Sequence, residues 1–145
     1  MNPVESVLER ARMLEIDQRN RCFGDEEIIP QCIEMVRIIQ NHPDLRGEFV
    51  NAFKKMWHSA DYGWEPIMFC MRVLCWKEIQ EYFRDIHSQS IASNDFRAEP
   101  CARGILEAYE DFWDSADEEP YGALEAYRNQ TANKICEATG DNVSS

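Results

Sequence analysis

The chain has 145 residues with 44% apolar side chains, which is enough to bury one core and too apolar for a disordered protein. Its formal net charge is −12, because 27 acidic residues outnumber 15 lysines and arginines. This excess disfavours binding to nucleic acid or to an anionic membrane through a charged surface. A basic protein partner, or solubility alone, is the expected reason for it.

Helical spacing of apolar residues recurs along the chain, and no long strand pattern is present. Five helices are predicted in the first ninety residues, with apolar seams over residues 4–14, 29–39, 45–57, 67–74 and 79–86. The first is expected to end near Gly24. Segment 67–74 is apolar nearly all round, which predicts the buried central helix. A sixth helix is predicted to start near residues 97–100, and a last one follows the seam of residues 124–135.

Proline positions support this division, because proline fits the first turn of a helix, where its missing N–H costs nothing. The prolines at predicted helix starts are Pro3, Pro43, Pro66, Pro100 and Pro120. Pro30 is also expected at a start, although Asp25 could cap an earlier one. We predict an all-α fold with a single domain of about seven helices over residues 1–138, and a frayed tail over 139–145. Either an irregular bundle or a short HEAT-like stack of helical hairpins fits.

No part of the sequence is typical of export or of a membrane anchor. The longest apolar run, residues 67–76, is broken by Arg72 and is about half the length that crosses a bilayer. The N-terminus has no basic start followed by an apolar core, so no signal peptide is predicted. The cysteines form no C-x-x-C pair and lie mostly at apolar helical positions: Cys22, Cys32, Cys70, Cys75, Cys101 and Cys136. Reduced thiols in a cytoplasmic protein are therefore expected.

The most unusual stretch, residues 104–127, contains no lysine, arginine or histidine. Its acids are Glu107, Glu110, Asp111, Asp114, Asp117, Glu118, Glu119 and Glu125. On a helix, the apolar and aromatic residues between positions 105 and 116 share one face, and the acids up to residue 118 share the other. Like charges three or four residues apart destabilise a helix by about 0.2–0.5 kcal/mol per pair. The acidic face of this predicted helix is expected to bind a basic partner. The alternatives are a face that is only solvated and a metal site.

Two turns place large aromatic residues beside acids: residues 60–65 and residues 117–122. Aromatic side chains in loops are favoured anchors of interfaces. Trp64 could instead fold back as a lid on the core. The predicted partner-binding residues are Glu107, Glu110, Asp111, Asp114, Asp117, Glu118, Glu119, Tyr121, Asp61, Tyr62 and Trp64.

Motifs of catalysis and of cofactor binding are missing from the sequence. It has no Ser/His/Asp, G-x-S-x-G, Walker or Rossmann pattern and no Glu-x-x-His motif of di-iron bundles. The acidic run 111–117 lacks the spacing and the central glycine of a calcium loop. His58 and His87 are predicted to close the third and fifth helices, where a cation is favourable. We therefore predict a binding protein that is not an enzyme, with no catalytic residue, metal or cofactor.

Residues 64–79, rich in aromatic residues, cysteine and methionine, and residues 98–117, with the acidic face, resemble a group of small, acidic, helical bacterial proteins. These are the immunity proteins of contact-dependent inhibition and related polymorphic-toxin systems. The resemblance implies a cytosolic protein that binds and blocks one cognate toxin domain, often a nuclease, and it assigns no residue roles. A nuclease must carry a basic cleft for phosphates, which an acidic face can occupy. The alternatives are a bacterial scaffold or adaptor that binds a peptide or helix, and a metal-binding helical protein of unknown chemistry.

Overall fold

A computed structural model describes residues 2–21, 24–110 and 118–139, with residues 21 and 132–139 described by their backbone alone. In these ranges every regular element is helical, which confirms the predicted all-α fold. The elements are α1 (Pro3–Arg21), α2 (Asp25–Gln40), the short 3-10 helix η1 (Pro43–Leu45), α3 (Arg46–His58), α4 (Glu65–Leu74), α5 (Lys77–Ala92), α6 (Ala98–Glu107) and α7 (Tyr121–Thr139). No described helix combines the length and the apolarity that a bilayer crossing requires.

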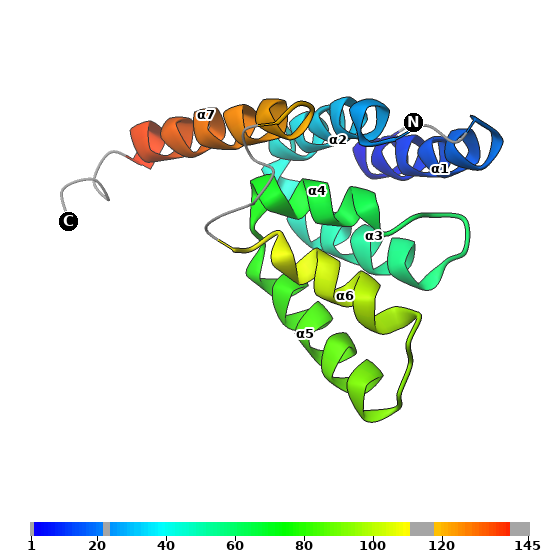
Figure 1. Ribbon diagram of the computed structural model, residues 1–145. Helices are drawn as coiled ribbons and strands as arrows, with labels where there is room; N and C mark the ends of the chain where they lie inside the picture. Colours follow the sequence, from blue (N-terminus) through cyan, green and yellow to red (C-terminus); the bar gives the residue numbers. More distant parts are fainter. Residues whose placement is uncertain (1, 22–23, 111–117, 140–145) are drawn as a thin grey trace.

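The first six α-helices form a short stack of three tiers of two consecutive helices, in which α1 contacts α2 and α5 contacts α6, while α3 and α4 are joined by the loop of residues 59–64. In one row α1 packs on α3 and α3 on α5, and in the other row α2 packs on α4 and α4 on α6. Figure 1 shows the three tiers in chain order from top to bottom, with α7 beside α2 in the upper tier. Helix α7 contacts α2 and α4. This arrangement corresponds to the HEAT-like alternative, because each hairpin packs on the next one along the chain.

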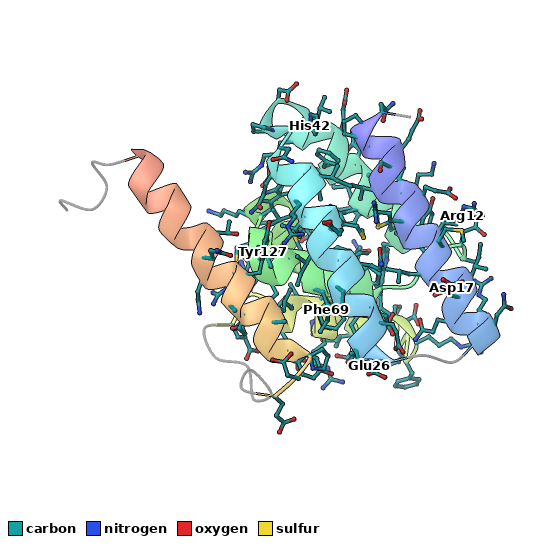
Figure 2. The ribbon with its side chains drawn as sticks, turned by 90° about the horizontal axis from the view of Figure 1, so that it is seen from above. Arg12, Asp17, Glu26, His42, Phe69 and Tyr127 are labelled. Carbon is teal, nitrogen blue, oxygen red and sulfur yellow. The ribbon has the colours of Figure 1, made fainter. Side chains whose placement is uncertain are left out.

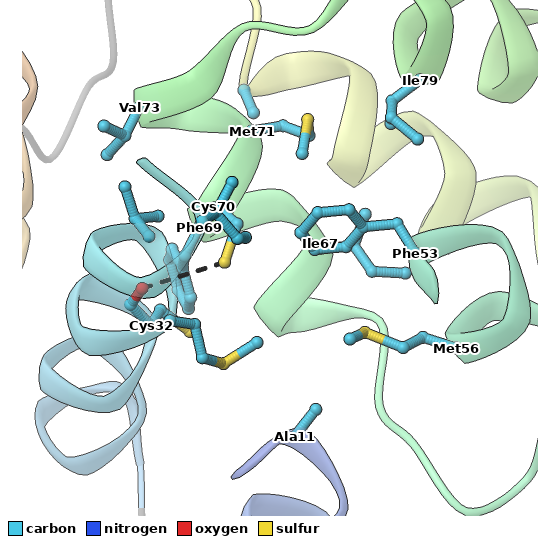
Figure 3. Packing of buried hydrophobic residues seen from close by; sticks show 14 of the residues in the cluster. Ala11, Cys32, Phe53, Met56, Ile67, Phe69, Cys70, Met71, Val73 and Ile79 are labelled. Carbon is cyan, nitrogen blue, oxygen red and sulfur yellow. Dashed lines mark hydrogen bonds between the residues drawn. The ribbon is translucent and has the colours of Figure 1, made fainter. Parts of the chain in front are cut away.

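Helix α4 lies at the centre of the core, as its apolar sequence predicts. It contacts α2, α6 and α7, and Ile67, Phe69, Cys70 and Met71 are buried almost completely. Figure 3 shows these side chains packed between those of neighbouring helices, with the Cys70 thiol directed at the carbonyl of Cys32, 3.9 Å away. The central helix therefore joins all three tiers through apolar contacts.

The start of α2 differs from the expectation for Pro30. The helix begins at Asp25 after the N-cap residue Gly24, and Pro30 lies inside it. The Gly24 N–H donates to the Glu27 carboxylate at 3.0 Å, and acids in this first turn are favoured by the helix dipole. These interactions favour the earlier start. Pro30 is exposed, so the carbonyl that loses its helical partner can be hydrated.

His87 lies inside α5 rather than at its end, because the helix continues to Ala92. The helix stops where Asn94 takes the left-handed conformation, with φ of 57°, and the Asp95 N–H donates to the Ser90 carbonyl at 2.8 Å. This is the hydrogen bond of a Schellman motif. His87 instead bridges to the next helix, with its Nε2 2.7 Å from an oxygen of Glu99 on α6.

Helix α6 ends at Glu107, so the predicted acidic helix does not continue through residues 108–110, and residues 111–117 lie outside the described part of the chain. The N–H groups of Ala108 and Tyr109 donate to the carbonyls of residues three positions earlier, each at 3.1 Å, which tightens the chain into a turn. The carbonyls of Ala108 and Glu110 accept hydrogen bonds from Arg72, the former at 3.0 Å. In a continued helix these carbonyls would accept from N–H groups four residues later. Arg72 thus provides hydrogen-bond donors for carbonyl groups at the place where the chain leaves the helix.

Trp64, in the loop before α4, packs against α6 at Gly104. A Cβ atom on Gly104 would lie 2.6 Å from Cζ3 and 2.8 Å from Cη2 of the indole. Trp64 is half-buried against the core, which agrees with the alternative of a lid. The sequence contains the two residues but no signal that they meet, since they lie forty positions apart.

Gly104→Ala is expected to lower the free energy of unfolding by about 1–2 kcal/mol, because the clash with Trp64 exceeds the gain in helix propensity. Gly47→Ala provides the matched control. Nothing lies within 4 Å of a Cβ at Gly47, which is exposed on α3, so this change should stabilise the protein by about 0.5–1 kcal/mol. Urea unfolding of both variants measures the difference. Two stabilising changes would contradict the packing of Trp64 on Gly104.

Candidate protein-binding edge

Three helices begin at one edge of the stack. Asp25 is the first residue of α2, Glu65 the first of α4 and Tyr121 the first of α7. The Tyr121 hydroxyl donates to the Asp25 carboxylate, and its ring lies 6.4 Å from that of Phe69. Figure 2 shows α7 starting beside the start of α2, near Glu26. Because a helix N-terminus carries partial positive charge, acids at these starts are favourable for each helix separately.

The helix starts bring acids from separate segments together, and we call this set the acidic edge: Glu15, Asp25, Glu26, Glu65, Glu118 and Glu119. A Cβ on Gly63 would lie 3.0 Å from a carboxylate oxygen of Glu15 and of Glu65, so both acids flank this loop. Glu26, Glu118 and Glu119 are exposed. Arg19 pairs with Glu15 at 3.0 Å, and its side chain is 56% exposed. The edge therefore keeps exposed negative charge.

The pKa values of two groups at the edge are raised in part by their acidic neighbours. The pKa of Tyr121 is raised to about 12, first by its hydrogen bond to Asp25, then by burial and by the charges of Asp25, Glu118 and Glu26. The pKa of Glu65 is raised, first by burial and then by the neighbouring charges of Glu15 and Asp25. Both groups thus lie in a negative field, which favours protonated forms.

We expect the phenol of Tyr121 to titrate near its raised pKa of about 12 rather than at the ordinary value of 10. Because the folded-state pKa is the higher one, its contribution to stability is complete below pH 10 and is lost as the pH rises through about 12. The near-ultraviolet absorbance of tyrosinate, followed against pH for the wild type and for Tyr121→Phe, isolates this group. Asp25→Asn should shift its midpoint downward. An ordinary midpoint in the wild type would contradict the Tyr121–Asp25 contact.

The predicted partner-binding residues lie in several places. Glu118 and Glu119 belong to the acidic edge and Tyr121 lies beside it, whereas Glu107 is the last residue of α6 and Glu110 lies in the turn that follows. Asp111, Asp114 and Asp117 lie outside the described residues.

Asp61 and Tyr62 lie in the loop between α3 and α4, where Asp61 is exposed and Tyr62 is half-buried. Burial raises the pKa of Tyr62, and charged neighbours from α1, Arg12 and Glu9, also act on it. Tyr62 therefore faces α1, while Trp64 of the same loop packs on α6. The two aromatic residues of this loop therefore pack toward two different helices, α1 and α6.

Glu125, an acid of the stretch 104–127, has partners within the chain. Glu125 on α7 accepts two hydrogen bonds from Arg72 on α4, at 2.8 and 2.9 Å, and Arg128 lies 3.8 Å away. Arg72 is completely buried. This pair attaches α7 to the central helix, so Glu125 contributes to the fold rather than to a free negative surface.

Sequence reasoning missed Asp25, Glu26, Glu65 and Glu15 as parts of the candidate site. The run of residues 25–27 before an apolar seam is a recognisable helix start, but its proximity to Tyr121 depends on how α7 packs. In the part of the chain that the structure describes, no group of histidine, cysteine, aspartate and glutamate side chains could hold a metal ion. The acidic edge is therefore a candidate for protein binding through charge.

Comparison with known proteins adds no further constraint, because no family model, no curated protein and no solved structure matches this chain. The chain is thus an all-helical stack with an acidic edge.

Proposed function

We propose that the chain is an immunity-type inhibitor protein, without enzymatic activity, that binds and neutralises a basic toxin domain in the cytoplasm. The observation that carries the proposal is the convergence of acids from four segments at the starts of α2, α4 and α7. Glu26, Glu118 and Glu119 are exposed there, and Tyr121 lies among them as an aromatic residue with a polar end. Aromatic residues surrounded by polar groups are typical of interface anchors.

A nuclease is the class of toxin that this negative charge fits best. A nuclease binds phosphates through lysine and arginine, so its active cleft is basic. An acidic surface accelerates encounter with such a cleft and can exclude the nucleic acid by occupying it. The resemblance to immunity proteins, carried by residues 64–79 and 98–117, supports the same class of partner.

The first experiment is co-purification of the tagged chain with the products of its neighbouring genes, beginning with the upstream one. A basic protein that is toxic by itself should be recovered in equal amount, and increasing salt should weaken the complex. Recovery of no basic partner from either neighbour, or a complex that salt leaves unchanged, would contradict the proposal.

A second candidate function is a scaffold or adaptor that binds a peptide or helix. The stack of hairpins favours it, because such stacks present extended binding surfaces. The two functions predict opposite behaviour in salt, since a largely apolar contact is not weakened by screening.

A further inference from the structure

A large groove lies at the end of α2 that is opposite to the acidic edge. It has a volume of ≈ 980 Å³ and is enclosed by the ends of α2 and α4, by η1 and by the middle of α7. Figure 2 shows Glu26 at one end of α2 and His42 beyond the other, with Tyr127 on α7. At 1.5 Å per residue, about 20 Å separates the two ends of this helix.

The charge of the groove is opposite to that of the whole chain. Among the described residues that line it, the charged side chains are Arg37 and Arg46, accompanied by His42, and none is acidic. The chain as a whole has a net charge of −12. Part of this placement is explained by the C-terminal ends of α2 and α4, where the helix dipole favours cations. The described lining of this groove therefore carries cationic side chains and no acid, on a protein that is acidic as a whole.

Both arginines are held in place by aromatic rings. The guanidinium of Arg37 lies 5.5 Å from the ring centre of Tyr127, and that of Arg46 lies 4.7 Å from the ring centre of Trp76. The Tyr127 hydroxyl donates to the side-chain oxygen of Gln40 at 2.9 Å, which fixes this wall of the groove. Stacked guanidinium groups lose less freedom when they bind an anion.

Each arginine also has an acidic neighbour outside the groove. Glu34 accepts from Nη1 of Arg37 at 3.0 Å, and Glu78 accepts from Nε and Nη2 of Arg46 at 3.0 and 2.7 Å. Hydrogen bonds from Arg46 lower the pKa of Glu78 to about 2. These bonds use one edge of each guanidinium, which has five N–H donors, and the side chains are about half exposed. Each arginine can therefore donate hydrogen bonds to a further carboxylate on the groove side.

We propose that this groove binds an acidic segment of a partner protein, with carboxylates on Arg37 and Arg46 and apolar groups against Tyr127. The volume is at the upper end of ordinary ligand pockets, which fits several residues of chain rather than a single ion. The neutral polar side chains Gln40 and Gln130 provide hydrogen bonds for a peptide backbone. The site is independent of the acidic edge and takes a partner of the opposite charge.

The test is selection of random peptides displayed on phage against the wild type and against Arg37→Gln/Arg46→Gln. The matched control is Arg84→Gln/Arg103→Gln, which changes the net charge equally at exposed positions on α5 and α6. Peptides that bind the wild type and the control but not the groove variant should be rich in aspartate and glutamate. A synthetic copy of such a peptide should bind the groove variant about tenfold or more weakly.

Cys75 gives a readout of position, because its exposed thiol lines the groove. The bound peptide should slow alkylation of Cys75 by iodoacetamide, measured by mass spectrometry, and leave the half-buried Cys101 unaffected. Lysine substitutions at Glu118 and Glu119 should leave the affinity for the peptide unchanged or slightly higher, which separates this site from the proposed function. Failure to select groove-dependent peptides, selection of peptides without acidic residues, or an unprotected Cys75 would each overturn the proposal.

Discussion

Arg72→Met is expected to lower the free energy of unfolding by about 3–5 kcal/mol, the usual cost of removing one partner from a buried ion pair. The side chain of Arg72 is 1% exposed. Its two hydrogen bonds to Glu125, at 2.8 and 2.9 Å, connect α4 to α7. Without the guanidinium, Glu125 would remain 15% exposed with only the longer contact to Arg128. The carbonyls of Ala108 and Glu110 would also lose their donor. Urea unfolding measures the change.

Two further variants separate these contributions. Arg72→Met/Glu125→Met removes both charges, so it should recover part of the stability, and a double-mutant cycle gives the coupling between the two residues. Recovery should stay incomplete because the two carbonyls still lack a donor. Arg12→Met is the matched control at an exposed pair, since Arg12 and Glu9 are 42% and 41% exposed, and it should change stability little. A single Arg72→Met variant as stable as this control would contradict the assigned role of Arg72.

Loss of Arg72 should also loosen α7 before the rest of the protein. Leu124 is the fully buried apolar residue of the part of α7 whose side chains are described, and Tyr121 and Tyr127 pack on the core only partly buried, with their hydroxyls hydrogen-bonded to α2. Hydrogen exchange in Arg72→Met should therefore increase most in α7 and at the end of α6. Uniform acceleration over all helices would show that Arg72 stabilises the core as a whole instead.

The second large effect is expected on binding. Glu26→Lys/Glu118→Lys/Glu119→Lys should slow association with a basic partner on the order of tenfold to a hundredfold at low salt, because it reverses the exposed charge of the acidic edge. Dissociation should change less, since steering acts mainly on encounter. Stopped-flow mixing or surface-based kinetics with the purified partner measures both rates.

The matched control reverses the same number of charges elsewhere. Glu48, Glu81 and Asp85 are exposed on α3 and α5, so Glu48→Lys/Glu81→Lys/Asp85→Lys changes the net charge equally. If the edge directs binding, this control should slow association much less. Equal slowing in both variants would mean that net charge alone attracts the partner, and no slowing in either would exclude an electrostatic interface. High salt should bring the rates of all three proteins together.

The sequence predicted much of the fold because helical periodicity is a local property. The seams at 4–14, 29–39 and 45–57 correspond to α1, α2 and α3, and the apolar run 67–74 corresponds to the buried α4. Pro3, Pro43, Pro66 and Pro100 lie within the first turn of their helices. Errors occurred where a distant side chain overrides the local pattern. The end of α6 is the main example, because Arg72 of another helix donates to the carbonyls of Ala108 and Glu110 just after it.

The candidate site depended even more on the tertiary structure. The acids of residues 104–127 are visible in the sequence, but one of them, Glu125, pairs with Arg72, which in the sequence only interrupts an apolar run. Asp25, Glu65 and Tyr121 are each a helix start, and only the packing of α7 on α2 and α4 brings them to one edge. By itself, the sequence determined the all-helical class, the central helix and the excess of negative charge. Helical periodicity depends only on residues that are near each other in the chain, and net charge depends only on composition. Which charges face each other was decided by the stacking of hairpins, because electrostatic contacts depend on distances in space.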